Sequence, residues 1–298
     1  MPLRPRIGIT LGDPAGIGPE IVRKAAGSQE ILQVCEPVLY GSADIADEFV
    51  GRESAEAGMA SYTAVEKAVR DALDGDIDGI ATAPISKSAW ALAGLPWRGH
   101  TECLAALTGA AEVRMLFYSN RLTVVLSTVH IALADVSKML TKECLKATVE
   151  LAHKELPHFG VDQPRLVVSG LNPHAGEDGL MGGEEQRVIT PVVQDCRRLG
   201  IDVSGPISGD TVFLRAAEGE FDAVIACYHD QGLIPVKLLS FGKAVNVTLG
   251  LPIVRTSVDH GTAFDIAGKD RADPSSMIAA VHLAAQLATA RAAALRVD

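Results

Sequence analysis

Short β-branched runs alternate with longer helical patterns along this sequence, and this alternation limits the fold more than any other feature. The predicted strands are residues 6–10, 37–40, 79–83, 114–118, 122–128, 165–169, 222–227 and 244–249. Helices are expected to begin near Pro19, Ser61, Thr141, Glu184 and Ser275. Pro19 suits a first helical position, and Thr141 and Ser275 suit N-caps. Strands that alternate with helices favour an α/β fold, in which helices cover a mostly parallel sheet.

The chain is long enough for two ordinary domains, at 298 residues. Aromatic residues make up only 4%, and the apolar weight in Ala, Val, Leu and Ile suits helices packed on a buried sheet. We expect one domain to comprise residues 1–110 and 244–298, and the other residues 111–243. Residues 44–60 are polar and weakly patterned, so they are the best candidate for a mobile connection. Gly200 is expected to end the helix that begins near Glu184.

The charge balance narrows the classes of partner. With 27 basic and 37 acidic residues the net charge is −10, which argues against nucleic acid. A small anion remains possible, because a pocket needs only a few local cations. The 5 cysteines form no C-x-x-C pair, which is typical of reduced thiols in the cytoplasm. Since the sequence shows neither a signal peptide nor an apolar run of about 18–20 residues, we expect a cytoplasmic protein without a membrane partner.

Three histidines follow predicted strands closely: His130, His174 and His229. In open α/β sheets, ligands bind just beyond the carboxyl ends of the strands. Three imidazoles delivered there could converge on one divalent metal ion and leave coordination positions open for a substrate. The alternative is three ordinary loop histidines that never meet, because no spacing places two of them on one helix face.

Two loops rich in small residues are candidates for binding phosphate or a cofactor. The first, GDPAGIGPE at residues 12–20, lacks the third glycine of the dinucleotide fingerprint and the lysine of a P-loop. A tight strand-to-helix turn is therefore its alternative interpretation. The second, HGTAFDIAGK at residues 260–269, contains small residues that let a backbone approach a flat cofactor closely. An ordinary strand-to-helix loop would look similar.

Several donors could bind a phosphate or a carboxylate. His100 and Thr101 lie at a turn before a helical run, and Lys237, Asn246 and Arg255 follow in the last quarter of the chain. Oxyanions are bound by such groups, best with one bidentate arginine. Taken singly, each is more often a solvated surface residue. Lys237 and Arg255 stand in apolar sequence, so each must be paired or ligand-bound if it is buried.

Several motifs occur together in one order: residues 12–20, Pro84 with Lys87, GHTE at 99–102, GLNPHAGE at 170–177, Gly205-Pro206 with Asp210-Thr211, YHDQG at 228–232, and DHGTAFDIAG at 259–268. Together they resemble the 4-hydroxythreonine-4-phosphate dehydrogenase family almost from end to end. The loop from His260 also resembles the cofactor loop of isopropylmalate and isocitrate dehydrogenases, which bind NAD without a classical Rossmann domain.

The resemblance implies two α/β/α domains flanking a cleft, as in isocitrate and isopropylmalate dehydrogenases. It places the cofactor on the first domain and the metal and dimer contacts on the second. It implies a homodimer with active sites at the subunit interface, to which both chains contribute. By correspondence, the ligands of a zinc, magnesium or cobalt ion are His130, His174 and His229. The implied substrate-binding residues are His100, Thr101, Lys237, Asn246 and Arg255. NAD or NADP is expected at His260, Gly261, Thr262, Ala263 and Asp265.

The implied reaction is the oxidation and decarboxylation of 4-hydroxythreonine 4-phosphate in vitamin B6 synthesis. The metal would stabilise the developing alkoxide of the substrate, hydride would pass to the nicotinamide, and the resulting β-keto acid would lose carbon dioxide. Arg255, Lys237 and the His100-Thr101 pair would hold the anionic ends of the substrate. Asp210 and Lys237 are the candidates for the general base.

Three alternatives remain open. Other members of the family act on threonate or erythronate phosphates, or on the cis-dihydrodiol of an aromatic dicarboxylate, and the same anion-binding residues suit them all.

The segment between Ser42 and Asp71 is shorter than in fuller-length members, which bears on the closure of the cleft and on substrate selectivity. From another class, a hydrolase or lyase with three histidine ligands would need no nicotinamide. A catalytically idle metabolite-binding protein is disfavoured, because every corresponding position is retained.

Overall fold

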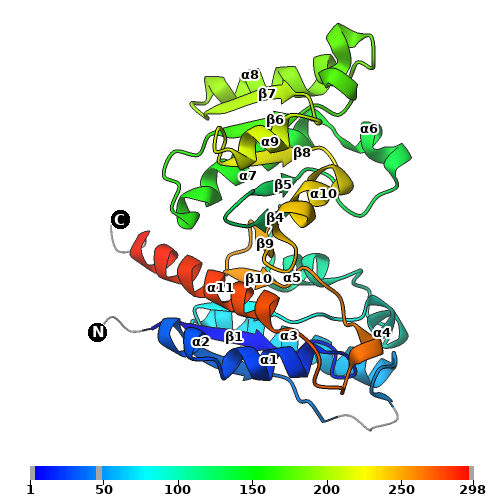
Figure 1. The fold of residues 1–298 in the computed structure, drawn as a ribbon, viewed down its shortest axis with the longest axis vertical. Coiled ribbons are helices and arrows are strands. Elements are labelled where there is room, and N and C mark those ends of the chain that lie inside the picture. The colour runs from blue at the N-terminus through cyan, green and yellow to red at the C-terminus, as the bar shows by residue number, and fades with distance from the viewer. Residues whose placement is uncertain (1–3, 45–48, 295–298) are drawn as a thin grey trace. The chain divides into compact units, whose positions relative to one another are not determined.

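The structure is a computed structural model that describes residues 4–44 and 49–294 (Figure 1). The chain divides into two compact units, one formed by Met1–Val113 with Val245–Asp298 and the other by Arg114–Ala244. The expected domain limits at residues 111 and 243 lie within three residues of this division. Strands and helices alternate in both units, so the predicted α/β class is confirmed.

The first unit contains strands in the order β2-β1-β3-β10-β9. Their bounds are Arg6–Thr10 for β1, Glu36–Tyr40 for β2, Gly79–Thr82 for β3, Val245–Leu249 for β9 and Arg255–Ser257 for β10. β1, β2, β3 and β10 pair in parallel, and β9 pairs antiparallel with β10, so the sheet is mixed. Parallel pairing brings the carboxyl ends of β1, β3 and β10 to one edge. The loops that leave this edge carry several of the predicted site residues.

Helices form two layers on the sheet of the first unit. One layer comprises α1 (Gly18–Ala26), α2 (Gln29–Val34) and α11 (Ser275–Ala294), with α11 packed on β3, β10 and β1. The other comprises α3 (Ala55–Asp74), α4 (Lys87–Leu92) and α5 (His100–Thr108), with α3 packed on β1, β2 and β3. A short 3₁₀ turn, η6, spans Phe264–Ile266. The apolar sides of α3, α4 and α5 meet the sheet in one buried cluster that includes Trp90 and Ile80.

α11 is long and apolar enough to cross a membrane by length and composition alone. It instead packs along β3 and β10, and 44% of its most apolar window is buried. Its small residues Ala280, Ala284 and Ala288 let it lie close to the strands. Its composition is therefore that of a core helix.

The second unit contains strands in the order β4-β5-β8-β6-β7. Their bounds are Arg114–Tyr118 for β4, Val124–Leu126 for β5, Leu166–Ser169 for β6, Val203–Ile207 for β7 and Ala223–Ala226 for β8. β4 and β5 are antiparallel, whereas β5, β8, β6 and β7 run in parallel. Four carboxyl ends therefore share one edge of this sheet.

Two helical layers also cover the second sheet. α7 (Lys142–Glu155) and α8 (Thr190–Arg198) pack on each other and on β5 and β7, while α9 (Val212–Ala217) and α10 (His229–Ser240) pack on β8 and β5. The shorter elements are η2 (Leu133–Asp135), α6 (Val136–Met139), η3 (Leu156–Phe159), η4 (Pro173–Gly179) and the π-helical η5 (Glu185–Ile189). The hydroxyl of Thr141 accepts a hydrogen bond from the backbone N–H of Cys144, as expected of the N-cap of α7.

The eight predicted strands are all present, each within two residues of its expected limits. β7 and β10 were missed, because Gly205-Pro206 interrupts the first and the second has only three residues. The expected helix start at Ser61 is wrong, since Ser54 caps α3 and the helix begins at Ala55. Residues 55–60 of the expected mobile connection are therefore helical, and residues 45–48 lie outside the described residues.

Other helix starts lie close to the prediction. Pro19 falls in the first turn of α1, and Ser275 is the first residue of α11. The helix expected from Glu184 begins as the π-helical η5 at Glu185 and continues as α8. It ends at Arg198, two residues before Gly200, whose φ of 86° marks the stop.

Candidate active site

The carboxyl-end edge of the second sheet carries four of the predicted site residues. His130 follows β5, His229 follows β8, His174 follows β6 and Asp210 follows β7. β5 and β8 are neighbours, with Leu126 opposite Ala226, so the chain leaves them side by side. All four residues therefore follow strands that end at the same edge of one sheet.

His130 and His229 lie together, with ring centroids 5.8 Å apart. Two imidazoles on one ion, each with a metal–nitrogen bond of about 2.1 Å, have centroids about 5 Å apart in tetrahedral geometry. The observed separation therefore fits a shared metal with a small adjustment. The Nδ1 atom of His229 lies 2.7 Å from Oδ1 of Asp230, a contact that orients the ring.

His174 does not complete a ligand set with this pair in the described part of the chain. Among residues 4–44 and 49–294, no group of three His, Cys, Asp or Glu side chains is close enough to hold a metal ion. His174 instead lies in η4, on the loop that follows β6. The structure therefore brings two of the three predicted ligands together within one chain.

The loop that carries His174 has an uncommon backbone. His174, Ala175, Gly176, Glu177 and Asp178 all have positive φ, between 44° and 85°, which makes a left-handed turn. For each of the four residues other than glycine, this conformation costs about 1–2 kcal/mol. Such a turn persists only when its surroundings hold it, and strain of this kind concentrates at functional sites.

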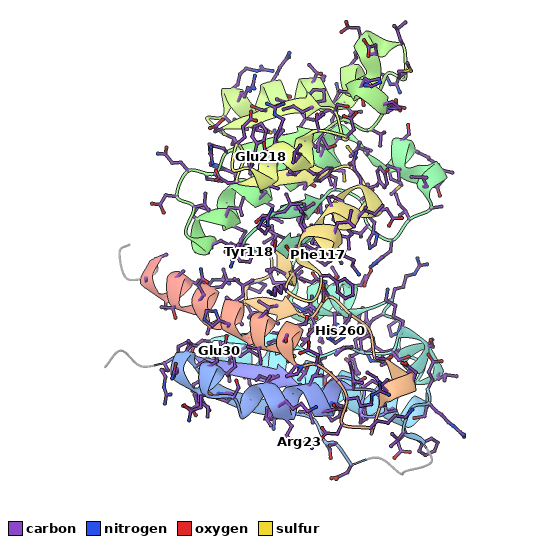
Figure 2. The ribbon with its side chains drawn as sticks, viewed as in Figure 1. Arg23, Glu30, Phe117, Tyr118, Glu218 and His260 are labelled. Carbon is purple, nitrogen blue, oxygen red and sulfur yellow. The ribbon has the colours of Figure 1, made fainter. Side chains whose placement is uncertain are left out.

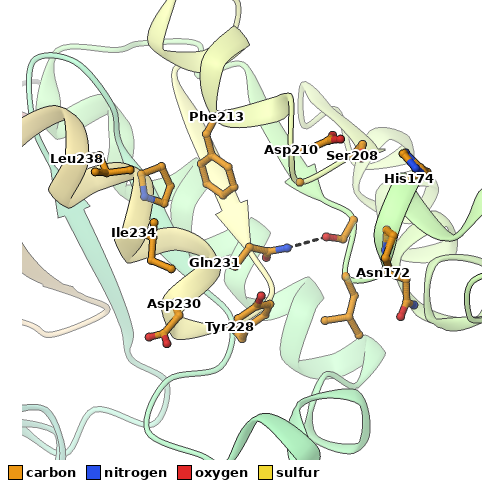
Figure 3. Close-up of a pocket in the computed structure, with 15 residues that line it drawn as sticks. Asn172, His174, Ser208, Asp210, Phe213, Tyr228, Asp230, Gln231, Ile234 and Leu238 are labelled. Carbon is orange, nitrogen blue, oxygen red and sulfur yellow. Dashed lines mark hydrogen bonds between the residues drawn. The ribbon is translucent and has the colours of Figure 1, made fainter.

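A cavity of about 620 Å³ opens beside this turn (Figure 3). Its lining includes His174, Asp210, Tyr228 and Asp230. Gln231 fixes one wall, since its side chain donates to the carbonyl of Gly170 at 2.7 Å and accepts from the backbone N–H of Cys227 at 2.7 Å. The cavity has room for a small polar metabolite. Asp210, one of the two base candidates, lines the same cavity as His174.

Lys237, the other base candidate, is exposed on α10. The apolar residues around it in the sequence do not bury it, because Ile234, Leu238 and Phe241 are themselves 59%, 81% and 80% exposed. The apolar context of Lys237 therefore marks an uncovered hydrophobic surface and not a core position.

A polar row crosses the sheet of the first unit. The strand register aligns Thr10 with Thr82, Thr82 with Ser257, and Ser257 with Asn246. Thr82 donates to the hydroxyl of Ser257 at 2.9 Å. The side-chain oxygens of Thr10 and Asn246 are buried and have no partner among the described residues. Unpartnered polar atoms in such a row indicate a place where a ligand binds.

Arg255 is the buried cation of this row. It is only 2% exposed, and its Nη1 and Nη2 atoms donate to Thr248 at 2.9 Å and to Thr82 at 2.8 Å. Nε is buried without a partner, and no carboxylate pairs with the guanidinium among the described residues. Burial lowers the pKa of Arg255 to about 9, so the group stays charged at neutral pH. A buried guanidinium that no carboxylate compensates is a candidate binding site for an anion.

His100 and Thr101 begin α5, where the free N–H groups of a helix attract anions. The ring of His100 packs edge-on against Trp90 with centroids 5.8 Å apart, and its buried Nε2 has no partner in the described residues. Burial, with the nearby charges of Arg255 and Lys87, holds the pKa of His100 well below its usual range. His100 is therefore a neutral imidazole at pH 7, able to donate or accept one hydrogen bond at Nε2.

The two glycine-containing loops pack on each other in the first unit. The backbone N–H of Ile17 donates to the carbonyl of Thr262 at 2.9 Å. A Cβ on Gly16 would lie 2.8 Å from that same carbonyl oxygen, and one on Gly18 would lie 2.1 Å from the carbonyl oxygen of Leu11. The glycines of residues 12–20 are thus explained by close backbone contact.

The predicted cofactor loop leaves β10 on this unit, with His260 at its start (Figure 2). Ala263 has a φ of 43°, and Gly261 is exposed. Nδ1 of His260 lies 3.0 Å from the carbonyl of Gly261. Asp265 lies in the short turn η6 that follows. The assignment of a cofactor to this loop stays a prediction.

Sequence reasoning missed three polar groups that the structure buries in the first unit. Thr82 and Thr248 hold Arg255, yet single threonines in strands give no signal in a sequence. The carboxyl of Asp13 is fully buried, accepts from the N–H of Ala15 at 2.9 Å, and leaves Oδ2 without a partner among the described residues. Burial raises the pKa of Asp13. Its place in the first glycine-containing loop was visible, but its burial was not.

Comparison with solved structures first shows the fold. The chain superposes on isocitrate dehydrogenase from Methylococcus capsulatus with a TM-score of 0.52 at 15% identity, covering 98% of this chain and 89% of that one. A likeness at this identity concerns the fold, which is therefore that of the β-decarboxylating dehydrogenases. The predicted fold class is confirmed.

Closer relatives define the family. The family model described as pyridoxal phosphate biosynthetic protein PdxA matches residues 19–284. A 4-hydroxythreonine-4-phosphate dehydrogenase of Desulforapulum autotrophicum is 43% identical over 327 residues, covering 96% of each chain. A D-threonate 4-phosphate dehydrogenase of Cupriavidus necator is 42% identical, covering 97% of this chain and 98% of that one. The chain superposes on the crystal structure of 4-hydroxythreonine-4-phosphate dehydrogenase from Klebsiella pneumoniae with a TM-score of 0.85 at 37% identity. The match covers 97% of this chain and 99% of that one.

The chain belongs to the PdxA family, as the resemblance in its motifs implied. It is accordingly a dehydrogenase, and membership of this family implies NAD or NADP as the hydride acceptor. Relatives with two different substrates match it about equally well, so identity alone does not choose between them.

Proposed function

We propose that this dehydrogenase oxidises and decarboxylates 4-hydroxythreonine 4-phosphate to 3-amino-2-oxopropyl phosphate, in vitamin B6 biosynthesis. The observation that carries the proposal is the buried guanidinium of Arg255, which has no carboxylate partner in the described chain. A phosphorylated hydroxy acid supplies two anionic groups for such a site. The relative from Desulforapulum autotrophicum bears the name of this activity.

In this proposal the residues of the first unit bind and orient the substrate. Arg255, held by Thr82 and Thr248, attracts one anionic end with a charge that is already desolvated. The start of α5 offers N–H groups and the neutral imidazole of His100 to an oxygen atom. Asn246 adds an unpartnered amide oxygen. Rigid donors and acceptors of this kind fix the carbinol hydrogen toward the hydride acceptor, which lowers the entropic part of the barrier.

The residues of the second unit would hold a divalent ion. His130 and His229 are close enough to share it, and we propose His174 as the third ligand. Bound there, a zinc, magnesium or cobalt ion would supply Lewis-acid stabilisation of the substrate oxygen. Asp210 lines the cavity beside His174 and is our candidate to accept the hydroxyl proton, with Lys237 as the alternative. NAD or NADP would take the hydride and would lie against the loop from His260 to Asp265.

We further propose that the enzyme is a cytoplasmic homodimer with shared active sites. The exposed apolar surface of α10, with Ile234 and Leu238, offers a face that a second copy would cover. In a dimer with shared sites the third imidazole need not come from the same chain. This would account for a single chain that brings two ligands together and not three.

The second candidate substrate is D-threonate 4-phosphate. The relative from Cupriavidus necator, which carries that name, is as similar to this chain as the relatives named for the first substrate. Both substrates carry a phosphate and a hydroxyl next to an acid-bearing carbon, so the Arg255 site suits either. They differ in one substituent, an amino group against a hydroxyl.

The test is NADH formation from 4-hydroxythreonine 4-phosphate, D-threonate 4-phosphate and an aromatic cis-dihydrodiol dicarboxylate. Each reaction is run with and without EDTA, with added divalent metal as the rescue. We expect EDTA-sensitive turnover of the first substrate, with kcat/KM at least tenfold above the others. Preference for another substrate would leave the proposed metal and hydride chemistry standing, but it would contradict the assignment to vitamin B6 biosynthesis. Activity that survives full metal removal would contradict the metal site itself.

A further inference from the structure

Glu185 is a buried carboxylate that the proposed mechanism does not use. It is 3% exposed and begins the π-helical η5. Its Oε1 atom accepts hydrogen bonds from the backbone N–H of Leu171 at 2.9 Å and of Asn172 at 2.7 Å. Its Oε2 atom accepts from Nδ2 of Asn172 at 3.0 Å. All three donors belong to the residues that lead directly into the left-handed turn of His174.

The residues on either side of Glu185 hold the same loop. Glu184 accepts a hydrogen bond from Nδ2 of Asn172 at 2.8 Å, and Nε2 of Gln186 donates to the carbonyl of Asp178 at 2.8 Å. Three consecutive side chains thus form hydrogen bonds with the beginning and the end of the turn. A π-helical turn widens the helix and changes which side chains share a face, and such turns recur at functional sites.

The turn also leaves no space between itself and the carboxylate. A Cβ on Gly176, in the middle of the turn, would lie 2.7 Å from Oε2 of Glu185. Gly176 has a φ of 85°, which favours glycine for a second reason. Glu185 therefore supports the strained backbone by hydrogen bonds at one end and by direct packing at its centre.

We propose that Glu185 is a positioning residue for His174, and that it sets the affinity of the metal site by holding the left-handed turn. The inference rests on the proposed function, in which His174 is a ligand. His174 is itself exposed, so the direction of its imidazole depends on the backbone of the turn that carries it. A ligand held in place by buried hydrogen bonds binds a metal more tightly than one on a free loop.

Two substitutions loosen the turn by independent routes. In Glu185→Gln the side chain keeps its shape, but its new NH₂ group must face N–H donors, so at least one of the three hydrogen bonds is lost. In Gly176→Ala the carboxylate is intact, and the added methyl group displaces the turn from it. Glu150→Gln is the matched control, because Glu150 is a half-exposed carboxylate on α7 that forms an ion pair with Lys146 at 3.7 Å.

The experiment is calorimetric titration of the metal-free full-length protein with Co²⁺, at a temperature where circular dichroism shows each variant to be folded. Wild type, the two turn variants, the control, His174→Ala and the double variant of His174 and Glu185 are compared. We expect Glu185→Gln and Gly176→Ala to weaken Co²⁺ binding about 10–100-fold. The control should stay within about twofold of wild type. Because Glu185 acts through His174, its substitution should cause no further loss once His174 is alanine.

Each result has one meaning. If folded Glu185→Gln and Gly176→Ala bind Co²⁺ as wild type does, while His174→Ala does not, the positioning role is wrong and the metal site stands. If the losses of Co²⁺ affinity from the His174 and Glu185 substitutions add fully in the double variant, the positioning role is also wrong, because Glu185 would then act independently of His174. If wild type binds no Co²⁺, or His174→Ala binds it unchanged, the proposed ligand set fails and the inference falls with it. If Glu185→Gln does not fold, Gly176→Ala decides the question.

Discussion

Replacing Arg255 by methionine should make the protein more stable and almost inactive. The guanidinium is 2% exposed, and burial lowers its pKa from its ordinary value to about 9. That shift corresponds to a penalty of about 5 kcal/mol on the charged form in the folded protein. Because the folded-state pKa lies below the unfolded value, the penalty is fully present at every pH below about 9 and is relieved only as the pH rises from about 9 toward the pKa of the unfolded chain.

Two hydrogen bonds oppose that penalty. The contacts of Arg255 with Thr82 and Thr248 contribute about 1.5 kcal/mol each, as hydrogen bonds to a charged group do. Methionine has a similar length and no charge, so it removes the penalty and both bonds together. The net expectation is a gain of about 1–2 kcal/mol in the free energy of unfolding, in line with the replacement of other buried charges by apolar residues.

Urea denaturation of the ligand-free protein measures the gain, and thermal melting with inorganic phosphate measures the function. Phosphate should raise the Tm of wild type and leave that of Arg255→Met unchanged, because only an occupied anion site stabilises the fold. kcat/KM should fall at least about 100-fold, the loss of one charge-assisted contact of about 3 kcal/mol. Arg70→Met is the control, since Arg70 is an exposed partner of Glu66 on α3, and both stability and the phosphate response should be kept. A variant that is less stable than wild type and still responds to phosphate would refute the reasoning.

Three further predictions follow from the site. The pKa of His100 lies well below 6.5 in the folded state, so the fold should lose stability as the pH drops below about 6.5, and His100→Asn should flatten that loss in urea titrations; an equal slope would contradict the neutral imidazole. Thr82→Val removes the acceptor of Nη2 of Arg255 and keeps the shape, so KM for the phosphorylated substrate should rise about tenfold with a smaller change in kcat, and an unchanged KM would show that Thr82 does not position the cation. Co-expressed His174→Ala and His229→Ala chains should recover activity in mixed dimers if the two ligands of one site come from different subunits, whereas a site built within one chain would stay inactive in every combination.

The α/β character and the strand positions could be read from the sequence, because buried parallel strands are short β-branched runs between helical patterns. β7 was missed for a local reason, since a glycine and a proline break its apolar pattern. The start of α3 was misjudged because the Ser54 cap is followed by polar and small residues, which look like a loop until the helix is packed. Propensity and pattern decide where such elements exist, and tertiary packing decides where they begin.

The sequence by itself determined which chemical groups this protein has and that strands deliver them to sheet edges. It could place His130, His174 and His229 after strands, because that depends only on chain order. It could not determine that β5 and β8 are neighbours, so the approach of His130 to His229 appears only in the folded sheet. Burial is likewise a property of the whole fold: Arg255 and Lys237 both stand in apolar sequence, yet one is enclosed by strands and the other lies exposed on a helix. Long-range strand pairing and the desolvation that accompanies it make the buried Arg255 a candidate anion site, and local sequence carries neither.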